Sequence, residues 1–308
     1  GSIEKIHELG YSEINRIQME VNELYLKYIK IYPDLLSPKE LSISQDKILK
    51  KNISIDKKTK KNKKYLYYKN KSDVIKKFTK LRKGINRDIL PKYFYKNNKI
   101  NERYNLKRVP KFTEEFNTGA YYSRASYDLK RKGTFFINLG KIDELPCSNS
   151  YSLSLHEGNP GHHYQTSIST TSNIPLFISF YNDEDTYVEG WALYAEYLGR
   201  EYLLNKNKNN YNLSKKEIYD LYGCYDMDLF RSCRLVIDTG IHYYGWTFKK
   251  SYNFLEAHCN LGKKDIENEI YRYSLNPGQA IAYKIGQIKF LELRNKFLKK
   301  YKKKNIKD

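Results

Sequence analysis

Residues 156–163 read HEGNPGHH, a combination of side chains that can bind a metal ion. In zinc peptidases, a His and the Glu that follows it on a helix have different roles. The His binds the ion, and the Glu takes a proton from the water that attacks the substrate. A second His normally follows four residues after the first. Here Pro160 occupies that position, and the next histidines are His162 and His163. A metal site in this segment therefore requires a helix that is not straight.

Neither later histidine can join His156 from a straight helix. At about 100° and 1.5 Å per residue, His162 would lie roughly 240° around the axis, and His163 would lie about 10.5 Å along it. Pro160 cannot donate the helical hydrogen bond to His156, and Gly161 tolerates unusual backbone angles. A bulge that absorbs two residues would give His162 the position that is normally four residues on. The spacing favours His162 as the second ligand, with His163 as the alternative.

A third ligand is expected from a helix predicted over residues 183–204, which contains VEGWALYAE. Asp185 or Thr186 can cap this helix and support the site from its first turn. Glu189 lies in the early turns, and Glu196 follows seven residues later on the same face. One carboxylate can bind the ion while the other orients a ligand. Two imidazoles with one carboxylate form a donor set that suits Zn²⁺.

Other side chains are candidates for the remaining steps of peptide hydrolysis. An oxyanion that forms on the substrate needs hydrogen-bond donors, and His242, Tyr273 and Tyr283 are the candidates. Asp238 precedes His242 by four residues and could orient its imidazole, as a neighbour on one helix face. His163, if it is not a ligand, is expected to lie beside the metal site.

Substrate binding is expected from two further groups of residues. Arg231 and Arg234 could hold a substrate carboxylate, as an exopeptidase requires, or could form a structural ion pair. Two short aromatic segments, 119–123 and 134–138, predict a β-hairpin or edge strands. Tyr121 in the first segment and Asn138 in the second could contact an extended peptide that pairs with the sheet edge.

The remaining sequence predicts a mainly α-helical protein with this small hairpin or edge sheet beside a cleft. Apolar periodicity predicts helices, whose ranges are 11–31, 71–87, 149–170, 183–204, 214–237, 240–257, 263–273 and 277–302. Residues 38–70 are rich in Lys and are predicted to form a loop or insertion, and 299–308 a frayed basic tail. We see no linker, so residues 1–308 are interpreted as one catalytic domain.

The formal net charge is +21, which raises the question of an anionic partner. Arg is scarce beside Lys, whereas nucleic-acid binders rely on Arg for forked contacts, so no specific nucleic-acid binding is expected. The main alternative to an enzyme is a non-catalytic, peptidase-like protein whose basic surface binds acidic partners. A third option is a basic nucleic-acid binder with an incidental His cluster. No apolar segment reaches the ~20 residues that span a bilayer.

The two motifs together, HEGNPGHHYQ and DTYVEGWALYAEYLG, resemble the domain-of-unknown-function 885 family, whose pattern is HExxPGHHxQ and then EGWAxYxE. That family is similar to the gluzincin zinc peptidases, which include helical oligopeptidases and carboxypeptidases. The resemblance implies Zn²⁺ on His156, His162 and Glu189, with Glu157 as the general base. It also implies a helical gluzincin-like fold and a peptide substrate.

Segments 119–139, 234–247 and 273–287 resemble later blocks of the same family, so the resemblance extends over most of the chain from about residue 105. Members of the family are often about twice as long, and the chain begins with Gly-Ser, which is typical of a cloning remnant. We therefore expect an N-terminal half to be missing. The compartment stays open: cytoplasmic if the chain is near full length, secreted or in the cell envelope if it is truncated. The oligomeric state is open as well.

Overall fold

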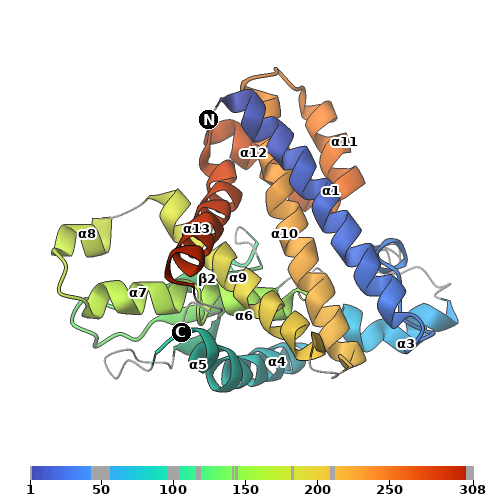
Figure 1. The fold of residues 1–308 in the computed structure, drawn as a ribbon, viewed down its shortest axis with the longest axis horizontal. Helices are drawn as coiled ribbons and strands as arrows, with labels where there is room; N and C mark the ends of the chain where they lie inside the picture. The colour runs from blue at the N-terminus through green and yellow to red at the C-terminus, as the bar shows by residue number, and fades with distance from the viewer. Residues whose placement is uncertain are drawn as a thin grey trace.

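Long helices make up most of the protein, and a small sheet lies among them (Figure 1). The computed structural model describes residues 2–42, 56–95, 104–115, 119–140, 142, 145–181, 184–208 and 212–302. Its helices are α1 (Ile3–Tyr28), α3 (Lys57–Leu66), α4 (Lys71–Gly84), α5 (Leu90–Tyr93), α6 (Ser150–Glu157), α7 (His162–Thr171), α8 (Leu176–Tyr181), α9 (Asp185–Lys208), α10 (Lys215–His242), α11 (Phe248–His258), α12 (Lys263–Leu275) and α13 (Gln279–Tyr301).

Helices α1 and α10 lie side by side along one side of the molecule (Figure 1). The apolar residues of α1 recur at helical spacing, so that Ile14, Ile17 and Leu24 are buried. Helix α10 begins with a capping box, in which Ser214 and Glu217 satisfy each other's backbone N–H groups. These features hold a long central helix in place against which the metal-site helices pack.

Helices α9 and α13 pack so closely that their backbones are in contact. A Cβ atom on Gly190 would lie 2.4 Å from the Cα of Gly286, so neither position has room for a side chain. This close approach follows directly after Glu189 on α9 and brings the early turns of α13, including Tyr283, close to that residue.

The sheet has three strands in the order β1–β3–β2: β1 (Asn105–Arg108), β2 (Ala120–Ser123) and β3 (Thr134–Ile137). Strands β2 and β3 pair antiparallel, which confirms the predicted hairpin. Strand β1, which pairs parallel to β3, was not predicted. Phe135 and Ile137 of β3 are buried in one cluster with Val74 and Phe78 of α4.

The prediction of a mainly helical protein with a small sheet is confirmed, but several boundaries were wrong. The 38–70 region contains α3, whose Leu66 is buried, because Asp56 caps a helix that the Lys-rich sequence concealed. Helix α10 continues through Gly240 to His242, where two shorter helices were predicted. The predicted helix 149–170 is two helices, and 71–87 continues as a π-helical segment over Ile85–Ile89. Most of the predicted basic tail, from residue 303 on, lies outside the described residues. No described helix is long and apolar enough to cross a membrane.

Candidate metal centre

A four-residue interruption, Gly158–Gly161, separates α6 from α7 and reorients the second half of the HEGNPGHH motif. The Asn159–Pro160 peptide bond in it is cis. The loop folds back closely on the end of α6, because a Cβ atom on Gly161 would lie only 1.9 Å from the carbonyl oxygen of His156. As a result, the imidazole of His162 faces that of His156, with ring centroids 4.8 Å apart and planes at 86°.

His156, His162 and Glu189 form a group that could hold a metal ion. Their donor atoms all lie within 4.8 Å of one another. Oε2 of Glu189 lies 3.3 Å from Nε2 of His156 and 3.4 Å from Nε2 of His162. Ligand atoms at about 2.0–2.1 Å from a tetrahedral zinc ion are about 3.3–3.4 Å apart, so these separations suit such an ion. His163, the alternative ligand, is not in the group.

The surroundings of these donor atoms show whether they fit a cation. Oε2 of Glu189 is buried and makes no hydrogen bond within the described part of the chain. Burial disfavours a charged His156, but Glu189 and Glu196 outweigh it and raise the pKa of that imidazole to about 10. The carboxylates thus make this place favourable for a cation, and the residues fit a metal ion.

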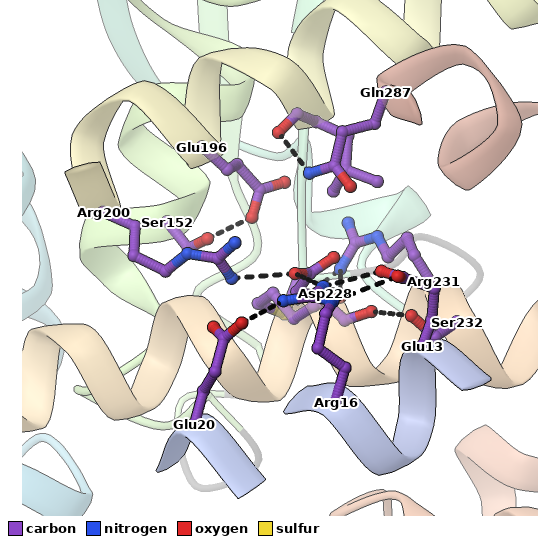
Figure 2. A network of polar contacts seen from close by, with 12 residues as sticks. Glu13, Arg16, Glu20, Ser152, Glu196, Arg200, Asp228, Arg231, Ser232 and Gln287 are labelled. Atoms are coloured by element: carbon purple, nitrogen blue, oxygen red, sulfur yellow. Dashed lines mark hydrogen bonds and ion pairs between the residues drawn. The ribbon is translucent and has the colours of Figure 1, made fainter. Parts of the chain in front are cut away.

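Glu196 contacts the imidazole of His156 at the ring nitrogen that does not face Glu189. Its Oε1 lies 2.7 Å from Nδ1 of His156, which leaves Nε2 of that ring facing Glu189. The other carboxylate oxygen of Glu196 accepts a hydrogen bond from the hydroxyl of Ser152 on α6 (Figure 2). A carboxylate on the far nitrogen of a ligating imidazole fixes the tautomer and raises its basicity. Sequence spacing placed Glu196 correctly on the face of Glu189, but gave no signal for Ser152.

Glu157 is buried beside the three donor residues, and no hydrogen bond or ion pair to its carboxylate is present among the described residues. Burial raises the pKa of Glu157, although the charges of His156 and His162 oppose this effect. A carboxylate that is free of partners and has a raised pKa is suited to accept and return a proton.

The two sequence motifs are joined by contacts that the sequence did not reveal. The indole of Trp191 donates to the carbonyl oxygen of Pro160 at 2.8 Å, and Gln165 donates to the carbonyl oxygen of Tyr187 at 3.2 Å. His163 is turned toward the sheet, where its Nδ1 lies 2.8 Å from the hydroxyl of Tyr122.

Asp185, predicted to support the site, is the first residue of α9, one turn before Glu189. Burial raises the pKa of its carboxyl, and the charge of Glu189 adds to the effect.

Of the predicted oxyanion donors, Tyr283 lies next to the metal centre, with its ring centroid 6.5 Å from that of His156. Its hydroxyl accepts from Arg272 at 3.3 Å, so its own proton can still be donated. The hydroxyl of Tyr273 instead donates to Glu269 and accepts from Nε of Arg234 at 3.0 Å. Tyr273 therefore has no free donor for a substrate.

The expected roles of His242 and Asp238 were wrong. His242 is exposed at the end of α10, where its Nε2 lies 2.9 Å from the carbonyl oxygen of Tyr273. His242 lies eleven positions after Arg231, whose charge acts on Glu157, and this separation corresponds to about 16 Å of helix rise. Asp238 accepts hydrogen bonds from the N–H of Gly278 instead of orienting His242. The two residues were assigned to the site because the sequence does not show how far they lie along α10 from the metal centre.

The predicted substrate contacts on the sheet were also wrong in part. The side-chain amide of Asn138 is used internally, since it donates to the carbonyl oxygen of Glu114 and accepts from the N–H of Gly140. Tyr121 stacks on Phe136 at 5.0 Å, whereas its neighbour Tyr122 reaches His163. Successive residues of a strand face opposite sides, so Tyr121 is on the face away from the metal motif.

Arg231 and Arg234 are both buried on α10, one turn apart. One of the two expectations for these arginines was a structural ion pair. Arg234 forms such a pair, since its Nη2 lies 3.1 Å from the carboxylate of Glu269. Arg231 has no ion pair within the described part of the chain.

A model of the family described as "Bacterial protein of unknown function (DUF885)" matches residues 2–308. The chain belongs to the DUF885 family. No curated protein matches the sequence.

Two solved structures share the fold of this DUF885 chain. A "putative lipoprotein" from Colwellia psychrerythraea has a TM-score of 0.80 at 24% identity and covers 97% of this chain and 46% of its own. A "putative lipoprotein of unknown function" from Shewanella oneidensis has a TM-score of 0.70 at 16% identity and covers 97% of this chain and 51% of its own. The chain thus spans about half the length of these relatives.

Proposed function

We propose that this chain is the catalytic region of a zinc-dependent hydrolase of peptide bonds, with a helical gluzincin-like arrangement. One observation carries the proposal: the donor atoms of His156, His162 and Glu189 converge within 4.8 Å, beside the unpaired carboxylate of Glu157. Two further observations support the proposal: Glu196 forms a hydrogen bond with His156, and Oε2 of Glu189 has no hydrogen-bond partner among the described residues. Peptide as the substrate rests on the resemblance of the motifs to zinc peptidases.

The chain's own residues have distinct tasks in this reaction. His156, His162 and Glu189 would hold Zn²⁺, which when bound polarises the carbonyl group and lowers the pKa of water. Glu157 accepts a proton from the attacking water, whose oxygen forms a bond to the carbonyl carbon. As the C–N bond breaks, Glu157 returns this proton to the departing amine. Tyr283 donates a hydrogen bond from its hydroxyl to the carbonyl oxygen of the substrate, which becomes negative as the water adds.

Substitution of Glu157 by Gln tests the proposal. We expect the variant to keep one zinc per chain, measured by elemental analysis, and to lose activity by at least about 10³-fold in a digest of a peptide library. Glu292→Gln, at an exposed position on α13 that is paired only with Lys289, is the matched control and should behave like the unchanged chain. Peptide cleavage that persists in Glu157→Gln would remove Glu157 from its role.

Metal content also separates this proposal from a non-catalytic, peptidase-like binding protein. The enzyme should contain about one zinc ion per chain when prepared without chelator, and His156→Ala should contain none. A folded chain that takes up no divalent ion would instead favour the binding protein, for which the net charge of +21 suggests acidic partners.

A further inference from the structure

Next to the metal centre lies a group of charged and aromatic side chains whose arginines have no role in the reaction above. It consists of Arg231 and Arg234 on α10, Glu269 and Arg272 on α12, and Tyr283 on α13, and is called the arginine cluster here. Two guanidinium groups pair with one carboxylate, since Glu269 lies 3.1 Å from Arg234 and 3.4 Å from Arg272, and the third, Arg231, acts on Glu269 only through space. The cluster therefore carries an excess of positive charge.

Arg231 is the member of the cluster without a direct anionic partner. Arg231 is 6% exposed. Among the described residues, its Nη1 donates only to the carbonyl oxygen and the sulfur of Met227, at 3.4 and 3.3 Å. Its buried Nε has no acceptor within the described residues, and neither has Nη1 of Arg234. Glu157, Glu269 and Asp226 interact with Arg231 only through space. Buried donors and charges without partners are costly, so these two atoms are suited to an anion from outside.

Tyr283 places the cluster within reach of the metal centre. Its ring is centred 6.5 Å from the ring of His156 and 4.5 Å from the guanidinium of Arg234, which therefore lies within about 11 Å of that imidazole. An extended residue spans about 3.3–3.6 Å. This separation leaves room for one or two residues of a peptide between the bond that is cleaved and the guanidinium groups.

We propose that Arg231, together with the unpartnered Nη1 of Arg234, binds the C-terminal carboxylate of the substrate, one or two residues beyond the cleaved bond. A guanidinium group offers two parallel N–H donors that match the geometry of a carboxylate. Arg272, whose side chain is 34% exposed and contacts Tyr283, connects the cluster with the surface. The inference rests on the proposed function and narrows it to a carboxypeptidase-type exopeptidase.

Binding without cleavage tests the site. A fluorescent peptide is prepared as the free acid, as the C-terminal amide, and as an amide that ends in Glu. Affinity for the Glu157→Gln chain is measured by anisotropy. We expect the free acid to bind roughly 10–100-fold more tightly than the plain amide. Arg231→Gln in the same background should reduce this ratio to about 1–3. Arg87→Gln, at an exposed arginine paired with Asp88, should keep the ratio.

Each outcome has a separate meaning. Equal affinity of acid and amide, or an equal loss for both in Arg231→Gln, would overturn the carboxylate site. Selective binding of the amide that ends in Glu would assign the site to acidic side chains and overturn the C-terminal preference. If Arg231→Gln is unfolded by circular dichroism, Arg231→Lys replaces it and should lower the ratio at least 3-fold. Peptide cleavage without an acid preference refutes the carboxylate site alone, whereas selective binding without any cleavage refutes the hydrolase alone.

Discussion

Trp191 donates its indole N–H to the carbonyl oxygen of Pro160 at 2.8 Å, and this bond is one of the contacts that join the two motifs of the candidate metal centre. Trp191 follows the candidate ligand Glu189 by two residues on α9, and Pro160 precedes the candidate ligand His162 by two residues. The bond therefore sets the distance between two ligands that come from different helices. It also explains why a tryptophan follows the carboxylate, where packing alone would accept other aromatic residues.

Replacing Trp191 by Phe should weaken metal binding more than it weakens the fold. The Phe ring can keep the contacts with Phe94 and Phe290, but the buried carbonyl of Pro160 loses its donor, which costs about 1–3 kcal/mol. We expect zinc affinity to fall roughly 10-fold in a competition titration with a chelator. Trp246→Phe, on the α10–α11 connection, is the control, and an equal loss of affinity there would contradict this role.

Gly161→Ala should abolish the metal site. A Cβ atom there would lie 1.9 Å from the carbonyl oxygen of His156 and 2.3 Å from that of Leu155, both backbone atoms that cannot move aside. The loop would shift, and His162 with it, so we expect loss of zinc by elemental analysis. Gly84→Ala is the matched control. A Cβ atom at this helical position meets nothing within 4 Å, and Ala is favoured over Gly by up to about 1 kcal/mol. Normal zinc content in Gly161→Ala would show that the loop adapts.

That the candidate ligands His156, His162 and Glu189 lie close together could be predicted from the sequence, because local rules determine much of their placement. Helix geometry shows that a straight helix cannot bring His156 and His162 to the same ion, and the helix is indeed interrupted between these two residues. The seven-residue spacing places Glu196 on the face of Glu189, and Glu196 contacts His156 in the structure. Both inferences need only the period of one helix and the chemistry of a few side chains.

The wrong predictions concern residues whose positions depend on contacts between distant segments, which no local sequence pattern shows. His242 looked suitable by type, but its distance from the metal centre depends on how far α10 extends, and α10 continues through Gly240 to His242. Tyr121 and Tyr122 are equivalent in sequence, and only the packing of β3 on α4 determines which face of β2 meets His163. Likewise, the amide of Asn138 is occupied by a loop that is distant in sequence.

Asp228→Asn should destabilise the fold behind the metal centre. Asp228 accepts from Lys284 at 2.6 Å and from Arg200 at 2.8 Å, and these buried pairs join α9, α10 and α13 (Figure 2). The substitution leaves the buried guanidinium of Arg200 without its ion pair and leaves Lys284 with Glu13 as its remaining carboxylate partner, so we expect the free energy of unfolding in urea at pH 7 to fall by about 3 kcal/mol. The control Glu292→Gln, at an exposed pair, should change it by less than about 0.5 kcal/mol.

The pH dependence of the Asp228→Asn effect has a defined sign. Burial opposes ionisation of Asp228, but Lys284 and Arg200 outweigh it and hold the pKa of this carboxyl well below its usual range. A carboxyl with a depressed pKa stabilises the fold above its unfolded pKa of about 3.9, and this contribution is lost as pH falls. The difference between the unchanged chain and Asp228→Asn should therefore shrink between pH 5 and pH 3. A difference that is the same at both pH values would show that charge is not its cause.

Asp226→Asn should have the opposite effect, and stabilise the protein at neutral pH. Burial raises the pKa of Asp226 to about 6, although Asn149 donates to its carboxylate at 3.0 Å and Arg231 acts on it through space. The folded state therefore holds this proton between pH 4 and 6 while the unfolded state releases it, so the free energy of unfolding falls as pH rises through that range.

Asparagine removes this pH-dependent cost and can still accept the hydrogen bond from Asn149. Asp226→Asn should match the unchanged chain near pH 4 and exceed its free energy of unfolding by up to about 3 kcal/mol at pH 8, which follows from a shift of about two pKa units. Urea unfolding at four pH values between 4 and 8 measures the effect. A variant that is less stable than the unchanged chain at pH 8 would mean that Asp226 is ionised in the fold and stabilises it, through Arg231 or another cation.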